Sequence, residues 1–208
     1  AEASLIDVLK KSFISNKFDE NDTITISLDV ERLILSINGT DNQREHLVLS
    51  GMTYPMAYGW MSIKLGTFQL DGGLFNDAAN YELEDYLKPD AEINSEDQFT
   101  YDQVVMYYSN AYHLFSRLKE ELEMQGALLI DPSNSNMVFL PDVSGMPKFG
   151  FSIGKKNFPE PYFFIGVLKE QVERIDNKED YEGIWDSGNS EFVIMASDFL
   201  TQNPDQEY

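Results

Sequence analysis

The sequence contains no cysteine. This absence excludes disulfides, thiolate metal ligands and cysteine nucleophiles, and it removes the usual clue to a redox compartment. Long apolar runs are also missing, because none approaches the roughly 20 residues that a membrane-spanning helix needs. The opening residues, AEASLIDVLKK, lack the basic-then-apolar order of a secretory signal. The sequence therefore predicts a soluble protein that does not act at a membrane, either cytoplasmic or associated with a virion.

Basic residues are scarce, since 15 lysines and arginines oppose 36 aspartates and glutamates and leave a formal net charge of -21. Electrostatic repulsion disfavours direct binding to nucleic acid or to an anionic membrane, and it favours a protein partner with a basic surface. The chain is nevertheless 42% hydrophobic and 13% aromatic over 208 residues. That is enough apolar material for one sizeable core or two small ones, so the sequence predicts a globular protein.

The acidic residues are concentrated in two segments. Residues 77–102 hold nine acidic residues and one basic residue, Lys88, and residues 157–208 hold twelve acidic residues and three basic ones. Segment 77–102 has two interpretations: a solvated connection, or a docking strip for a basic partner, because long polar loops in compact domains usually have a use. The candidate contact residues in the two segments are Glu82, Glu84, Asp85, Glu179, Asp180 and Glu182.

The residues that common catalytic sites require are few. The only histidines, His46 and His113, have no histidine neighbour at a metal-ligating spacing, and Ser144 is not in a G-x-S-x-G motif. The phosphate-binding motifs G-x-x-x-x-G-K-[ST] and G-x-G-x-x-G are both missing. We therefore assign no catalytic, cofactor-binding or metal-binding residue, and an enzymatic function is the less favoured interpretation.

One pair of carboxylates keeps an enzymatic alternative open. Asp186 and Glu191 are close in sequence to Trp185, and two carboxylates beside an aromatic ring are typical of glycosidases. With 36 acidic residues, such neighbours also arise by chance. A carboxylate-dependent hydrolase, with or without a divalent cation, is therefore an alternative function.

The N-terminal residues show helical spacing. The apolar residues Leu5, Ile6, Leu9 and Phe13 recur at intervals of about three to four. This spacing predicts a short amphipathic helix over 4–15 that lays one face on the core.

Alternating apolar residues follow. They occupy every second position over 24–30 and again, with shifted parity, over 33–37. Residues 31–32 therefore form either a bulge in one long strand or a tight hairpin between two strands. Asn38-Gly39 predicts a turn into a further strand around 46–50.

An aromatic segment comes next. Apolar residues alternate over 60–70 and change parity at Gly66, which predicts a strand with a bulge at that glycine. In an extended segment Tyr58 and Trp60 would share a face. Packing in the core is the default interpretation of this segment, and the alternative is a contact surface on which Tyr58 and Trp60 are aromatic anchors for a partner.

The firmest predicted element is a long amphipathic central helix. Thr100 and Gln103 have the spacing of a capping box, and Gly126 has the conformational freedom to end the helix. The apolar face is predicted to comprise Val104, Tyr108, Ala111, Phe115, Leu118 and Leu122.

Short strands are predicted after this helix, at about 127–131, 136–140 and 148–153, with a last strand at 191–196. Segment 162–175 fits either a strand or a helix, and the apolar spacing after a proline favours the helix.

The order of these elements predicts an α+β fold with antiparallel sheet rather than a parallel doubly wound one. The chain is either one domain over 1–208 or two similar subdomains, 1–98 and 99–208, each a helix followed by hairpins.

The leading functional hypothesis is a non-enzymatic interaction module that docks a protein partner, as an inhibitor, an immunity factor or a subunit of an assembly. A decoy that mimics nucleic acid is a further alternative, which requires the two acidic segments to lie on one face. The sequence does not determine the oligomeric state.

Overall fold

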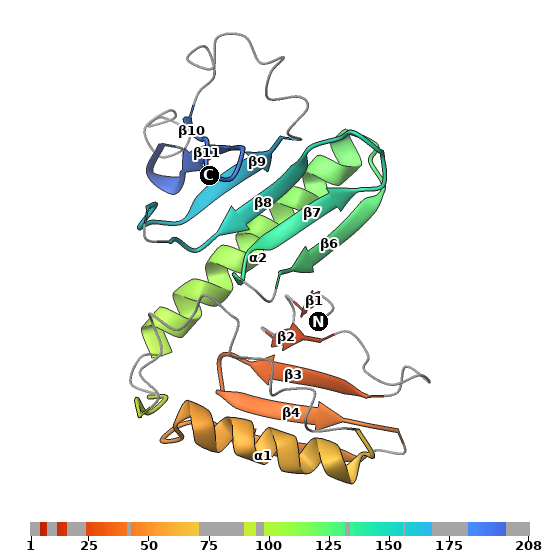
Figure 1. Cartoon of the computed structure of the whole chain (residues 1–208), viewed down its shortest axis with the longest axis vertical. Helices are drawn as coiled ribbons and strands as arrows, with labels where there is room; N and C mark the ends of the chain where they lie inside the picture. The colour runs from red at the N-terminus through yellow and green to blue at the C-terminus, as the bar shows by residue number, and fades with distance from the viewer. Residues whose placement is uncertain are drawn as a thin grey trace. The chain divides into compact units, whose positions relative to one another are not determined.

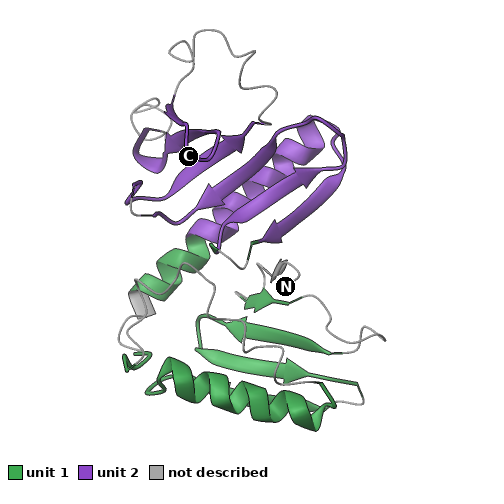
Figure 2. Ribbon diagram, viewed as in Figure 1, with its two compact units in different colours: residues 1–106, 131–134 green, residues 107–130, 135–208 purple. Residues whose placement is uncertain are grey.

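The protein is described by a computed structural model. The described residues are 5–7, 12–15, 24–40, 43–70, 90–94, 98–131, 134–155, 157–167 and 183–198. The chain divides into two compact units: unit 1 is residues 1–106 with 131–134, and unit 2 is residues 107–130 with 135–208 (Figure 2). Each unit contains one antiparallel sheet, which confirms the predicted α+β class.

Unit 1 contains a five-stranded sheet in which each strand pairs with the next one in sequence. Its strands are β1 (Leu5–Asp7), β2 (Ser12–Ile14), β3 (Thr25–Asp29), β4 (Ile34–Asn38) and β5 (Arg44–Val48). Asp29 pairs with Ile34 across a tight turn, so the hairpin interpretation of residues 31–32 is confirmed. The predicted turn at Gly39 is also present, because its N–H donates to the Gln43 carbonyl at 2.8 Å.

The helix predicted over 4–15 is wrong. Strands β1 and β2 lie there instead, and Ile6 pairs with Phe13. Strand β2 is itself hydrogen-bonded to β3, so that Phe13 lies opposite Leu28. A short apolar run fits both the helical and the strand period. The available edge of β3 decides between them, because it supplies partners for the backbone groups of β2.

The strand predicted over 60–70 is also wrong, because helix α1 (Tyr54–Thr67) spans most of that segment. Pro55 lies in the first turn of α1, where proline is well tolerated because the first N–H groups of a helix need no partner within it. Ala57 and Leu65 are buried, and their spacing places both on one side of the helix. Gly66 is therefore a helical residue rather than a bulge.

The core of unit 1 lies between α1 and one face of the sheet (Figure 1). Ile37 and Leu65 are almost fully buried and belong to one cluster, whereas Leu33, Leu49 and Ala57 form another. Lys64 of α1 also pairs with Glu45 of β5 at 3.0 Å. Because strand residues alternate between faces, the remaining residues of β3 and β4 point to the opposite face of the sheet.

Unit 2 contains a six-stranded antiparallel sheet in the order β10-β11-β9-β8-β7-β6. Its strands are β6 (Gly126–Ile130), β7 (Met137–Pro141), β8 (Lys148–Ser152), β9 (Tyr162–Gly166), β10 (Ile184–Asp186) and β11 (Glu191–Met195). The predicted strands at about 127–131, 136–140, 148–153 and 191–196 are confirmed within a residue or two. Strand β10 is too short for its alternation to have been recognised.

The preferred helix over 162–175 is wrong where the structure describes it, since Tyr162–Gly166 is strand β9. This strand pairs with both β8 and β11 and is therefore interior to the sheet. An interior strand with both faces covered is apolar throughout, which hides the alternation that would have identified it. Residues 168–175 lie outside the described residues.

Helix α2 (Gln98–Glu121) confirms the predicted long helix but differs at both ends. It begins two residues before Thr100, which is therefore inside the helix and not its N-cap. It ends before Gly126, because Glu123 adopts a positive φ of 52° and the Met124 N–H donates to the Lys119 carbonyl at 2.9 Å. A hydrogen bond of this type closes a helix without a glycine.

The predicted apolar face of α2 is partly confirmed. Tyr108, Ala111 and Phe115 are buried, whereas Leu122 is exposed beyond the end of the helix. Phe115 contacts Phe163 with ring centroids 6.0 Å apart. Aromatic contacts of this kind hold the second half of α2 against one face of the unit 2 sheet (Figure 1).

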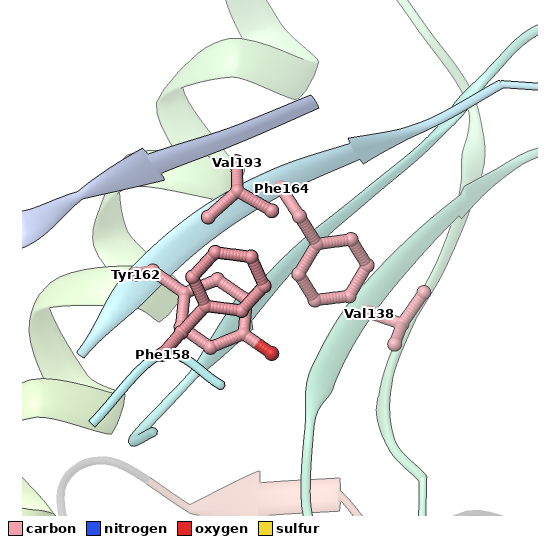
Figure 3. Close-up of a cluster of buried hydrophobic side chains, with 5 residues drawn as sticks. All are labelled: Val138, Phe158, Tyr162, Phe164 and Val193. Atoms are coloured by element: carbon pink, nitrogen blue, oxygen red, sulfur yellow. The ribbon is translucent and has the colours of Figure 1, made fainter. Parts of the chain in front are cut away.

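The opposite face of the unit 2 sheet carries a separate cluster of buried side chains. Its members are Val138, Phe158, Tyr162, Phe164 and Val193 (Figure 3). Three of these residues lie on the adjacent strands β9 and β11, where Tyr162, Phe164 and Val193 project to the same side.

Candidate functional site

The six acidic contact candidates lie outside the described residues. They are Glu82, Glu84, Asp85, Glu179, Asp180 and Glu182. The acidic docking strip therefore stays a prediction.

The two aromatic anchor candidates do not share a face, contrary to the prediction. Because α1 is a helix, residues two positions apart lie on different sides of it. Trp60 packs against the cluster of Ile24, Ile37 and Leu65. Tyr58 instead lies beside Tyr54, with ring centroids 6.1 Å apart. Trp60 therefore packs partly against the core, and the anchor role of both residues stays a prediction.

The side of α1 that faces away from the sheet is apolar. Met56 is 55% exposed and Ile63 is 71% exposed. Gly59 and Gly66 lie on the same side, and a Cβ on either would meet no atom of the described chain within 4 Å. We call these four residues the α1 outer face. The sequence analysis did not identify this face, because the strand predicted for the segment would have placed these residues on two different faces.

The α1 outer face is also far from acidic residues along the chain. Segment 46–70 contains no aspartate or glutamate, although the whole chain carries 36 of them. The one ion pair that the described residues form with α1, Lys64 with Glu45, lies at its sheet side. An exposed apolar helix face without carboxylates can be covered by another protein without desolvating charge.

A second feature lies on the face of the unit 1 sheet opposite α1. There the structure has a hollow of about 640 Å³, which we call the β3–β4 hollow. Its lining residues are Ser12, Ile14, Thr25, Ser27, Asp29, Glu31, Arg32, Ile34, Ser36, Asn38 and Arg44. They come from alternate positions of β2 to β5 and the turn between β3 and β4. The alternation of apolar residues over 24–30 and 33–37 leaves polar residues on this face, but it gave no sign of a hollow.

Hydrogen bonds connect the polar groups at one end of the hollow. Arg44 Nη2 lies 3.5 Å from Ser36 Oγ, and Asn38 Nδ2 lies 3.5 Å from Ser27 Oγ. Ser36 is only 2% exposed. No carboxylate among the described residues pairs with the Arg44 guanidinium. In so acidic a chain, an exposed arginine without a carboxylate partner is available for an anionic group.

The carboxylates suspected of hydrolase chemistry are brought together. Asp186 of β10 and Glu191 of β11 are direct cross-strand partners. Each, however, is paired with a lysine: Asp186 Oδ2 lies 3.3 Å from Lys155 Nζ, and Glu191 Oε1 lies 3.0 Å from Lys148 Nζ. Trp185 projects to the other face of the sheet, where it contacts Phe192. The aromatic ring and the two carboxylates therefore do not form one site.

The protonation of Asp186 also bears on its chemistry. Burial raises the pKa of Asp186, but hydrogen bonds from Asn189, Lys155 and the Gly188 N–H together lower it by more. The net pKa is therefore below its usual value. For Lys155, burial lowers the pKa, whereas Tyr162 and Asp186 raise it, and the net pKa is raised. Both groups are therefore charged at neutral pH, and Asp186 is a poor proton donor.

Neither histidine contributes to a cluster. His46 and His113 are both exposed, and His113 contacts Tyr112 with ring centroids 5.9 Å apart. Across the part of the chain that the structure describes, no three histidine, aspartate or glutamate side chains are grouped as metal ligands. Among the same residues, no helix has both the length and the apolar character needed to cross a membrane.

No protein-family model, curated protein or solved structure matches this chain. The features of the described residues that bear on function are the α1 outer face, the β3–β4 hollow and the paired carboxylates.

Proposed function

We propose that this protein is a non-enzymatic interaction module that docks a basic protein partner through the α1 outer face. The observation that carries the proposal is the exposure of Met56 and Ile63 on a helix side that has no acidic residue. Inhibitors, immunity factors and subunits of assemblies all belong to this class.

The shape of the α1 outer face suits a partner helix. The outward side of a surface helix is normally polar, whereas α1 leaves Ile63 71% exposed there. Gly59 and Gly66 flank Ile63 along the same side and present no side chain. A partner helix can therefore approach the backbone of α1 closely, with Ile63 fitting between the side chains of the partner.

The charge of the chain favours a basic partner over a second copy. Two copies would bring together two chains of net charge -21 each, and the repulsion would oppose association. A partner with an apolar helix face and a basic rim would instead be attracted by the negative potential of this chain. The acidic candidates Glu82, Glu84, Asp85, Glu179, Asp180 and Glu182 are proposed to supply that attraction.

The lysine-paired carboxylates support binding over hydrolysis. A retaining or inverting glycosidase needs one carboxyl group that holds a proton. Asp186 is instead held ionised, and Glu191 is paired with Lys148.

The test compares two variants that each add one carboxylate to an exposed apolar position. Ile63→Glu alters the α1 outer face, and Val143→Glu alters a turn of unit 2 in which Val143 is 54% exposed. A partner is first captured from the source cells with the unaltered protein at low salt and identified. It is then purified and titrated against all three proteins. Ile63→Glu should weaken binding at least about tenfold, as expected for a central interface position, whereas Val143→Glu should bind normally.

Three outcomes would count against the proposal or a part of it. Equal binding by Ile63→Glu and the unaltered protein would remove the α1 outer face from the interface. Self-association of the purified protein, abolished by Ile63→Glu in sedimentation experiments, would replace the basic partner with a second copy. Replacing the six acidic candidates by their amides should slow association and flatten its salt dependence, and unchanged rates would remove the electrostatic part.

A further inference from the structure

We infer that the β3–β4 hollow binds a short extended peptide that carries a carboxylate at one end and a cationic group at the other. This inference does not depend on the α1 outer face, because the hollow and α1 lie on opposite faces of the unit 1 sheet. The volume of about 640 Å³ is within the range of roughly 300–1,000 Å³ that is usual for small-ligand sites.

The carboxylate end of the site is the row formed by Thr25, Asn38 and Arg44, which are direct neighbours across β3, β4 and β5. The Arg44 guanidinium has one weak hydrogen bond, to Ser36 Oγ at 3.5 Å. The guanidinium is planar, and two of its other N–H groups can donate parallel hydrogen bonds to the two oxygens of a carboxylate. The Thr25 hydroxyl and the Asn38 amide of the same row can donate further hydrogen bonds.

The opposite end of the hollow is acidic. Asp29 and Glu31 both line it, together with Arg32. Asp29 already accepts a hydrogen bond from the Arg32 N–H through Oδ1 at 2.9 Å. Its second carboxylate oxygen is available to a cationic group, and a charge-assisted hydrogen bond there would orient the ligand.

The separation of the two ends sets the length of the ligand. Thr25 and Asp29 are four residues apart on β3, which corresponds to about 13–14 Å along a strand. An extended tetrapeptide spans the same distance, at about 3.3–3.6 Å per residue. A free amino acid is therefore too short to reach both ends, and a tetrapeptide with free termini is long enough.

The middle of the hollow suits a peptide backbone. Ser27 and Ser36 are paired across β3 and β4 at its centre, and hydroxyl groups both donate and accept hydrogen bonds. None of the lining residues that the structure describes is aromatic, so these residues offer no ring platform of the kind that a sugar usually requires. Ser27 is half-buried and can bond a peptide backbone group, whereas Ser36 is 2% exposed and is already bonded to Arg44.

The charge of the protein limits which carboxylates can enter. A net charge of -21 repels a simple anion, but it does not repel a ligand whose ammonium group balances its carboxylate. The described lining residues are balanced in charge, with two arginines and two acidic residues. A dipolar peptide is therefore favoured over inorganic phosphate or a dicarboxylate.

The experiment is a titration of the isotope-labelled full chain, followed by two-dimensional amide NMR. The probes are the peptide Gly-Ala-Ser-Gly with free termini, its C-terminal amide, its N-acetyl form, and an amidated tetrapeptide whose only carboxylate is a glutamate side chain. The free peptide should shift the amide signals of Ser27, Ser36, Asn38 and Arg44. Amidation of its C-terminus should weaken binding at least about tenfold, because hydrogen bonds between charged groups are the strong ones. The glutamate probe shows which kind of carboxylate Arg44 binds. Weak binding of this probe means that Arg44 selects an α-carboxylate, and strong binding means that a side-chain carboxylate is also accepted.

Two variants and one control complete the test. Arg44→Gln should weaken binding of the free peptide as much as amidation does, and amidation should cause no further loss in that variant. Asp29→Asn keeps an oxygen for the Arg32 N–H and should reproduce the effect of N-acetylation. Arg117→Gln removes the same charge from unit 2 and should leave binding unchanged.

The inference is overturned if the free peptide shifts no signal of the hollow at several millimolar, or if Arg44→Gln binds it as well as the unaltered protein does. If Arg44→Gln fails to fold, its amide signals will lose their dispersion, and the failure will be recognised in the spectrum. In that case Arg44→Lys, which keeps the charge but not the fork, replaces Arg44→Gln, and undiminished binding by it has the same consequence.

Discussion

Gly150 of β8 lies directly opposite Phe164 of β9, and a Cβ on the glycine would be 2.0 Å from Cζ of the phenylalanine ring. The ring fills the space where a side chain of residue 150 would be. Phe164 is 3% exposed and packs with Val138, Tyr162 and Val193 (Figure 3), so it has little room to move away. The absence of a side chain at position 150 is therefore a packing requirement of unit 2.

Gly150→Ala should destabilise the protein by about 1–3 kcal/mol, the usual cost of overpacking a filled core. Urea unfolding followed by circular dichroism measures the change. The double variant with Phe164→Leu should recover part of the loss, because the smaller side chain makes room for the methyl group. An additive loss in the double variant would contradict this explanation.

Gly59→Ala should have the opposite effect on stability. A Cβ at this helical position meets no described atom within 4 Å, and alanine is favoured over glycine inside a helix by about 0.5–1 kcal/mol. Thermal unfolding should therefore show a higher midpoint. The same variant should weaken docking of a partner helix, because the added methyl group keeps the two backbones apart. A stabilised variant with unchanged partner affinity would argue against close helix packing at this position.

The two ion pairs Lys148–Glu191 and Arg117–Glu121 should differ in their contribution to stability. The second pair is shorter, at 2.7 Å against 3.0 Å, but Glu191 is 9% exposed whereas both members of the Arg117 pair are more than half exposed. Lys148→Met leaves a buried carboxylate without its cation and should cost about 1–3 kcal/mol. Arg117→Met should cost no more than about 0.5 kcal/mol. Equal losses in chemical denaturation would show that burial does not govern the difference.

Asp186 should make a pH-dependent contribution to stability. Its pKa in the folded protein is lowered from the usual 3.8, so the folded state binds a proton less readily than the unfolded state. The contribution is therefore complete above about pH 4 and is lost as the pH falls through the lowered pKa. Asp186→Asn should be less stable than the unaltered protein by roughly 1 kcal/mol near neutral pH, because it loses charge-assisted hydrogen bonds.

The difference in stability between Asp186→Asn and the unaltered protein should shrink in acid. The exposed control Asp142→Asn should differ little in stability from the unaltered protein at any pH. Unfolding by urea over a pH series provides the measurement. A constant gap between Asp186→Asn and the unaltered protein would mean that the hydrogen bonds act independently of the carboxylate charge.

The local signals of the sequence were reliable where they were long or framed by turns. Helix α2 follows from a repeated apolar spacing over more than four turns, and the hairpin of β3 and β4 follows from two alternating runs around residues 31–32. The sequence predicted the functional features less well. Asp186 and Glu191 could be paired through a short hairpin, but Lys155 is 31 positions from Asp186, and no local pattern joins them.

The sequence by itself determined the acidic charge, the α+β class and the elements whose periodicity allows one solution. Tertiary structure alone decided the segments around 5–14, 54–67 and 162–166, because a short apolar run fits both periods until a neighbouring surface supplies its partners. It also decided the functional surfaces. The α1 outer face exists only because residues 56, 59, 63 and 66 are helical, and the β3–β4 hollow exists only because hydrogen bonding between strands places Arg44 beside Asn38 and Thr25.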